Sequence, residues 1–181
     1  MCIRDRLIID DLTKGVGIRF VWMRIFSTYG PLDEGSWLIP NIVDSLVNEE
    51  KVKLTKGEQN WSYLHAYDLA SAFQTVIRET QINGIVNVGN PKTVVLKDAI
   101  EMIAMKLGAK GLLGFGKMDY RPDQVMKLEP ACESLTAIGW SPIVSFENGV
   151  AQTIQWRHRE TVEPLRCVDG QEVVFNLPSR R

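Results

Sequence analysis

The sequence of 181 residues is poor in cysteine and histidine and carries almost no net charge, and each shortage excludes a class of protein. Its three cysteines, Cys2, Cys132 and Cys167, are odd in number and have no CxxC spacing, so they predict no disulfide framework. The two histidines add too few ligands for a zinc site. Lysine and arginine total 21 against 22 aspartate and glutamate, so charge gives no reason to expect a nucleic-acid partner.

A long apolar run is also absent. No stretch approaches the roughly 20 apolar residues that cross a bilayer, and acidic residues interrupt the N-terminal segment MCIRDRLIIDDL where a signal peptide needs its apolar stretch. We therefore expect a cytoplasmic protein with no membrane partner. Apolar residues make up 45% of the sequence and charged residues 24%, which is the composition of a globular domain that buries its own core.

Hydrophobic patterning predicts the α/β fold class. Residues 18–26, IRFVWMRIF, are almost wholly apolar and β-rich, which is typical of a parallel strand covered by helices on both faces. Further short strands are expected at residues 51–55, 61–66 and 84–89. Amphipathic spacing predicts helices at residues 5–15, 37–50, 69–79, 96–108 and 146–160. Asp68 is predicted to cap the third of these helices, and residues 161–181 to form a poorly ordered, loosely attached tail.

Four sequence motifs follow one another in a fixed order. They are RIFSTYGP at residues 24–31, WSYLHAYDLASA at 61–72, GIVNVGNP at 84–91, and the pair YRPDQV and IGWSP at 120–125 and 138–142. Their order and spacing resemble those of the extended short-chain dehydrogenase/reductases of the nucleotide-sugar epimerase/dehydratase family. The resemblance runs from about residue 7 to residue 158. It implies the C-terminal part of a Rossmann-type fold, with residues 1–160 forming the last parallel strands and a small α/β substrate-binding lobe.

The strand end FSTYGP, together with Arg121, carries the strongest implied binding residues. Ligands of parallel α/β sheets bind beyond the carboxyl ends of the strands. The resemblance implies that Phe26 lies beside the nicotinamide and that Ser27 binds substrate where many relatives have asparagine. It also implies that Arg121 binds a diphosphate, whose oxygens match paired guanidinium donors. The ordinary alternatives are a polar turn residue at Ser27 and a solvated surface arginine at Arg121.

Three apolar residues complete the implied substrate site. Trp37 and Leu38 stand where relatives clamp the nucleotide with an Asn-Leu pair, and Leu54 stands where a side chain often covers the base; plain apolar packing explains all three equally simply. The second phosphate arginine of relatives is replaced by Trp61, for which core packing is favoured over stacking on a ring. His65 is interpreted as a structural histidine rather than a catalytic one.

Departures from the family pattern also concern helix caps. Relatives often have serine and aspartate at the positions of Val95 and Ala131, where helices begin near Leu96 and Cys132. Each missing cap is expected to cost about 1 kcal/mol.

Two signatures of the family, G-x-x-G-x-x-G and Tyr-x-x-x-Lys, do not occur in the 181 residues and are expected upstream of Met1. The resemblance implies that a complete enzyme binds NAD or NADP and a nucleoside-diphosphate sugar, commonly as a homodimer, and acts as an epimerase, dehydratase or 4-keto reductase. We expect this chain to be an inactive fragment, without catalytic residues of its own. The alternative is a non-catalytic module that binds a sugar nucleotide or pairs with a complete subunit.

The stretch GLLGFGKM, residues 111–118, nearly matches the phosphate-binding loop G-x-x-x-x-G-K-[ST], so a P-loop nucleotide binder is a distant alternative. Met118 replaces the hydroxyl that would bind magnesium, and the DYRP that follows is a poor helix start. We therefore interpret the glycines as a flexible connector.

Overall fold

The computed structural model describes residues 3–33, 37–157, 165–166 and 172–173. Its helices are α1 (Ile3–Gly15), α2 (Leu38–Val47), α3 (Ala66–Arg78), α4 (Leu96–Lys106), α5 (Glu133–Thr136) and α6 (Phe146–Arg157), with a 3-10 turn, η1 (Lys110–Leu112). Its strands are β1 (Val21–Ile25), β2 (Thr28–Tyr29), β3 (Val52–Lys53), β4 (Asn60–Trp61), β5 (Leu64–His65), β6 (Gly84–Val88), β7 (Val94–Val95), β8 (Leu113–Gly114), β9 (Lys127–Leu128), β10 (Leu165–Arg166) and β11 (Glu172–Val173). The predicted helices and main strands therefore exist.

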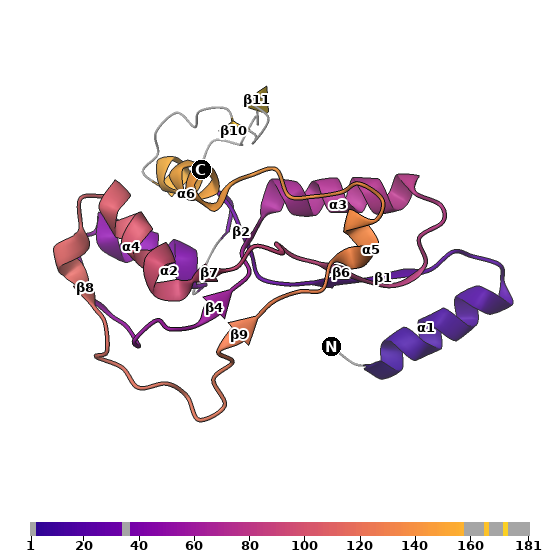
Figure 1. Ribbon diagram of the computed structural model, residues 1–181, viewed down its shortest axis with the longest axis horizontal. Coiled ribbons are helices and arrows are strands. Elements are labelled where there is room, and N and C mark those ends of the chain that lie inside the picture. Colours follow the sequence, from indigo (N-terminus) through magenta and orange to yellow (C-terminus); the bar gives the residue numbers. More distant parts are fainter. Residues whose placement is uncertain (1–2, 34–36, 158–164, 167–171, 174–181) are drawn as a thin grey trace.

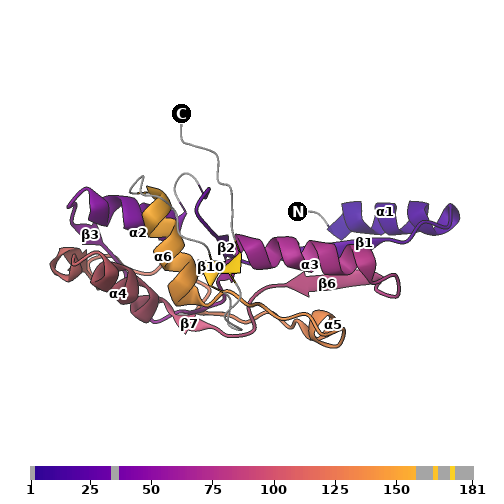
Figure 2. The ribbon, with the colours of Figure 1, turned by 90° about the horizontal axis from the view of Figure 1, so that it is seen from above.

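The sheet end of the molecule is built on two parallel strands. β1 pairs with β6 from Val21 opposite Gly84 to Ile25 opposite Val88, and β2 pairs in parallel with β5. Helix α3 lies along this sheet and α5 contacts β6 (Figures 1 and 2). A core that includes Leu64, Ala72 and Val86 fills the space between them. This arrangement confirms the predicted α/β class with parallel strands.

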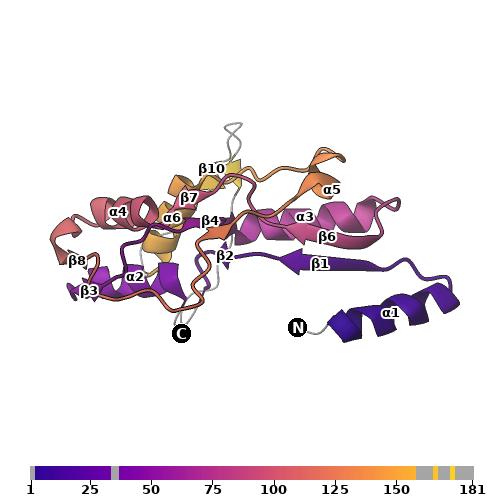
Figure 3. The same cartoon turned by 60° about the horizontal axis from the view of Figure 1, so that its bottom comes forward.

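The prediction that residues 18–26 are covered on both faces is wrong. The β1 side chains are half-buried or exposed, and Ile25 is 47% exposed. Helix α1 has no buried residue and lies apart, at the end of the molecule opposite α2 and α4 (Figure 3). Among the described residues, β1 pairs only with β6. The apolar run is therefore an edge strand here, because these residues place no further strand beyond it.

Helices α2, α4 and α6 form a separate lobe around a second core. Ile42, Val43 and Ile103 are almost completely buried in it. Two small sheets border the lobe: β3 pairs with β8, and β4 lies between β7 and β9. Successive residues serve the two cores, because Tyr63 belongs to the lobe core and Leu64 to the sheet core.

The segment 61–66, predicted as one strand, is divided. β4 pairs antiparallel with β7 and parallel with β9, whereas β5 pairs with β2. Between them, the Ser62 hydroxyl donates to the Asn90 carbonyl at 2.9 Å and accepts from the Asn90 N–H at 3.0 Å. Sequence alternation cannot show this division, because both halves contain alternating apolar residues.

Asp68 does not cap α3, which corrects the sequence prediction. The N-cap residue is His65, whose Nδ1 accepts from the Tyr67 N–H at 3.3 Å. Asp68 lies inside the first turn and is completely buried. Its carboxylate accepts from the N–H groups of Ile143 and Val144, at 2.9 and 3.1 Å, and so joins α3 to the segment before α6.

The other two cap positions differ from each other. α4 begins after Val95 without a side-chain cap, as predicted, whereas α5 begins after Cys132, one residue beyond the predicted Ala131.

Residues 111–118 do not form a phosphate loop. Gly111 lies in η1, and Gly114 lies in β8 paired with β3. No helix begins directly after Lys117, where a phosphate loop would have one. Backbone N–H groups of Lys117 and Met118 donate to the Leu54 carbonyl, so the segment is held against the lobe rather than forming a free connector. Of the predicted tail, only β10 and β11 lie within the described residues, where they pair antiparallel.

Candidate functional site

A cavity of about 960 Å³ lies between the carboxyl end of β1 and the lobe. All six residues implied by the sequence motifs line it: Phe26, Ser27, Trp37, Leu38, Leu54 and Arg121. They come from the end of β1, the start of α2, the end of β3 and the loop between β8 and β9. The fold therefore gathers residues separated by up to 95 positions around one space.

The strand end of the cavity is held by backbone hydrogen bonds. The Phe26 N–H donates to the Val88 carbonyl at 2.9 Å, which extends the β1–β6 ladder by one residue. The Ser27 carbonyl accepts from the Leu64 N–H at 2.9 Å. The backbones of both residues are therefore fixed against neighbouring strands, and both residues line the cavity.

Trp61 also lines the cavity. Its ring is half-buried and packs against the lobe core, as favoured from the sequence. The indole Nε1–H donates to the Ser27 Oγ at 2.7 Å, which is a short and well-formed hydrogen bond. Trp61 therefore packs in the core and also orients a polar group of the cavity.

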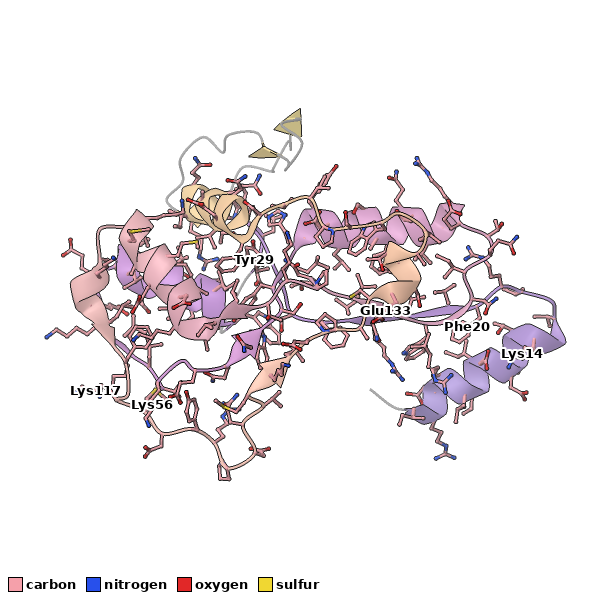
Figure 4. The ribbon with its side chains drawn as sticks, in the orientation of Figure 1. Lys14, Phe20, Tyr29, Lys56, Lys117 and Glu133 are labelled. Atoms are coloured by element: carbon pink, nitrogen blue, oxygen red, sulfur yellow. The ribbon has the colours of Figure 1, made fainter. Side chains whose placement is uncertain are left out.

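The opposite end of the cavity is apolar. Leu54 is buried there, and Leu96, Ile100 and Phe115 complete the wall. The ammonium of Lys97 lies 5.5 Å from the centre of the Phe115 ring. Lys56 and Lys117 project near this end in Figure 4, from segments joined by backbone hydrogen bonds. An apolar wall of this kind suits a planar ring such as a nucleobase.

The charged groups of the cavity are balanced. Lys53 and Arg121 contribute positive charge, while Asp33 and Asp119 contribute negative charge. The ion pairs within the described ranges do not include Arg121. Its exposed guanidinium is therefore available to bind an anion.

A buried polar cluster lies behind the cavity, under α6. Tyr29, labelled at the centre of Figure 4, stacks edge-on against His65 with ring centres 5.4 Å apart. Burial lowers the pKa of His65 to about 4, although the neighbouring Gln152 opposes the shift. Burial also raises the pKa of Tyr29, and the Asp68 charge adds to this. At neutral pH, His65 is therefore neutral and Tyr29 is protonated, which indicates a structural role for both.

Gln59 and Phe115 are among the cavity residues that the sequence motifs missed. Gln59 is 5% exposed and its Oε1 has no hydrogen-bond partner among the described residues. Gln59 lies in the polar stretch 56–60 between two predicted strands, where a glutamine gives no specific signal. Phe115 lies in the glycine-rich stretch, where sequence patterning predicts no structure.

The residues that the structure describes do not form a dinucleotide phosphate site. Gly89 follows β6, but a Cβ there would lie 2.5 Å from Pro130 Cγ, so this glycine makes room for Pro130 rather than for a phosphate. β6 leads into Asn90 and β7 rather than into a helix N-terminus. Phe26 alone remains as an implied nicotinamide contact.

Other classes of site receive no support from the described ranges. No group of three or more histidine, cysteine, aspartate or glutamate side chains within them could hold a metal ion. Their helices are also too short or too polar for any to cross a membrane.

A parallel α/β arrangement with a cavity at the carboxyl end of its strands is typical of Rossmann-type folds. The model of the NAD dependent epimerase/dehydratase family matches residues 6–89. Over this stretch the chain is similar to the extended short-chain dehydrogenase/reductases of this family. The sequence resemblance is thereby confirmed.

Similar proteins agree with this assignment. The chain is 26% identical over 140 residues to CDP-abequose synthase of Salmonella muenchen, covering 76% of the chain and 48% of that protein. It is 30% identical over 140 residues to GDP-L-fucose synthase 1 of Arabidopsis thaliana, covering 71% and 42%. The structure of UDP-glucose 4-epimerase from Thermotoga maritima with UDP-glucose superposes with a TM-score of 0.77 at 18% identity, covering 85% and 50%. The chain thus spans about half the length of the relatives it matches.

Proposed function

We propose that this chain is the substrate-binding part of an NAD(P)-dependent enzyme that epimerises, dehydrates or reduces the sugar of a nucleoside diphosphate sugar. The observation that carries the proposal is the cavity, since all six residues implied by the family motifs line it. The names of the relatives include CDP, GDP and UDP sugars, which supports the ligand class and leaves the base open.

The lining of the cavity supports one orientation of the ligand. The base would lie against Leu54 and Phe115, at the apolar end. Arg121 would bind the diphosphate, and the sugar would lie beside Ser27 and Phe26, at the carboxyl end of β1. This order places the sugar where a nicotinamide would meet it in a complete enzyme.

The chain alone is proposed to bind its ligand without converting it. His65 is buried and its Nδ1 caps α3, and the described residues form no cofactor phosphate site. A non-catalytic binding or subunit-pairing module remains the second candidate, because the cavity is present in a chain whose sequence contains neither G-x-x-G-x-x-G nor Tyr-x-x-x-Lys. The two functions differ in whether added cofactor and a complementing cofactor-binding half restore turnover.

Isothermal titration of the purified 181-residue chain with UDP-glucose, dTDP-glucose, CDP-glucose and GDP-mannose tests the proposal. We expect saturable binding of at least one of them, weakened about tenfold by Arg121→Met, because the paired donors to a phosphate are lost. Arg78→Met, an exposed arginine at the end of α3, is the matched control and should bind normally. A folded chain that binds none of the four compounds refutes the proposal.

A further inference from the structure

The hydrogen bond between Trp61 and Ser27 decides what Ser27 can offer a ligand. A serine hydroxyl has one donor proton and two acceptor lone pairs, whereas an indole N–H only donates. The Trp61 Nε1–H therefore occupies one acceptor position of the Ser27 Oγ, at 2.7 Å. The Ser27 proton and one lone pair remain for a ligand, so the hydroxyl can donate into the cavity.

Trp61 is rigid enough to act in this way. It lies in the central strand of a three-stranded sheet, opposite Val94 on β7 and Leu128 on β9. Its ring packs against the lobe core, so the direction of the indole N–H is set by the fold. Ser27 is fixed in turn by the bond from the Leu64 N–H to its carbonyl.

We propose that Trp61 is a positioning residue that presents the Ser27 hydroxyl as a hydrogen-bond donor to a sugar oxygen of the bound nucleoside diphosphate sugar. The inference rests on the proposed function and deepens it. The pair is uncharged, and the cationic Arg121 is the stronger phosphate ligand of this cavity, so the diphosphate falls to Arg121 and a neutral sugar oxygen to Ser27. Recognition of the sugar and recognition of the diphosphate are therefore carried by different residues of one cavity.

The test is a double-mutant cycle measured by isothermal titration with UDP-glucose and with UDP, or with the equivalent pair for the base that the wild-type chain prefers. Trp61→Phe keeps an aromatic ring and removes the N–H, and Ser27→Ala removes the hydroxyl. Each variant should weaken binding of the sugar nucleotide five- to tenfold and binding of the nucleoside diphosphate less than twofold. The double variant should bind no more weakly than Ser27→Ala alone, because each change removes the same oriented Ser27 hydroxyl.

Trp22→Phe, which changes an indole on β1 outside the cavity, is the control and should leave both affinities unchanged. Equal weakening of both ligands by Trp61→Phe, or additive losses in the double variant, would show that Trp61 only packs, and would overturn the inference. If Trp61→Phe does not fold, Ser27→Ala still decides, since an unchanged preference for the sugar nucleotide over the diphosphate overturns the inference. Absence of binding by the wild-type chain refutes the proposed function as well, whereas wild-type binding with unaltered variants refutes this inference alone.

Discussion

The buried His65 makes the stability of this chain depend on pH in a calculable way. The side chain is 3% exposed, and its Nδ1 accepts a backbone N–H, so protonation of the imidazole would break a cap and place a charge in the core. Its pKa is about 4 in the fold and 6.5 in the unfolded chain. The unfolded state therefore binds more protons between these values, and the free energy of unfolding falls as the pH falls through this range.

The magnitude follows from the two pKa values. Stability from this group is complete above pH 6.5, falls by about 2 kcal/mol between pH 7 and pH 5, and has lost about 3 kcal/mol below pH 4. His65→Asn removes the titration while keeping an acceptor that suits an N-cap. The variant loses packing against Tyr29 at every pH, which shifts its curve without changing the slope.

Urea unfolding of both proteins at half-unit intervals from pH 7 to pH 5 measures the effect. The difference in free energy of unfolding between wild type and His65→Asn should shrink by about 2 kcal/mol toward pH 5. Asp68, whose pKa is raised by burial, contributes with the opposite sign in both proteins and cancels in the difference. Parallel curves for the two proteins would refute the reasoning, because they would show that His65 is not held neutral by the fold.

Three further predictions concern the free energy of unfolding in urea at pH 7. A Cβ at Gly149 would overlap the Tyr29 hydroxyl and lie 2.9 Å from His65 Cδ2, so Gly149→Ala should lower the free energy of unfolding by about 2 kcal/mol. Gly111→Ala, which places its Cβ in open space, should lower it by less than about 0.5 kcal/mol. Equal effects of the two changes would contradict this packing. Asp68→Asn should lower the free energy of unfolding by about 1–3 kcal/mol, because the amide replaces a carboxylate that accepts two backbone N–H groups. The control Asp98→Asn, at an exposed position, should be near neutral. An Asp68→Asn variant as stable as the wild type would show that these two bonds contribute little. Val95→Thr should raise the free energy of unfolding by about 1 kcal/mol, because its hydroxyl would cap α4. Val94→Thr should not raise it, and equal effects of the two changes would contradict the prediction.

The order of the elements was predictable from sequence because each long element carries its own pattern. The apolar stripes of α3 and α4 and the β-rich run at β1 depend on residues close together in the chain. The errors arose where distant segments decide the outcome. Asp68 stands where a cap is expected, but two N–H groups some 75 residues away take its carboxylate. The burial of β1 depends on other strands beside it, and the local sequence pattern does not reveal whether these strands are present.

The candidate site was predictable only through its motifs. Arg121 lies far from Phe26 and Ser27 in the sequence, and nothing in the periodicity of either segment indicates that they share a cavity. Leu96 and Ile100 follow the pattern of ordinary core residues, since a cavity wall and a core face are equally apolar. The Trp61–Ser27 bond joins a half-buried residue of β4 to a half-buried residue between β1 and β2, and only the folded backbone brings the two polar atoms within 2.7 Å.

The alternation of Tyr63 and Leu64 between two cores has a consequence for how such a chain can diverge. A substitution at Tyr63 or at Leu64 changes the packing of one core only. An insertion or deletion of one residue would instead place both side chains in the wrong core. The segment should therefore accept changes of residue type far more readily than changes of length. The stretch 119–126 is largely exposed, so length differences among relatives that remodel the cavity should collect there instead.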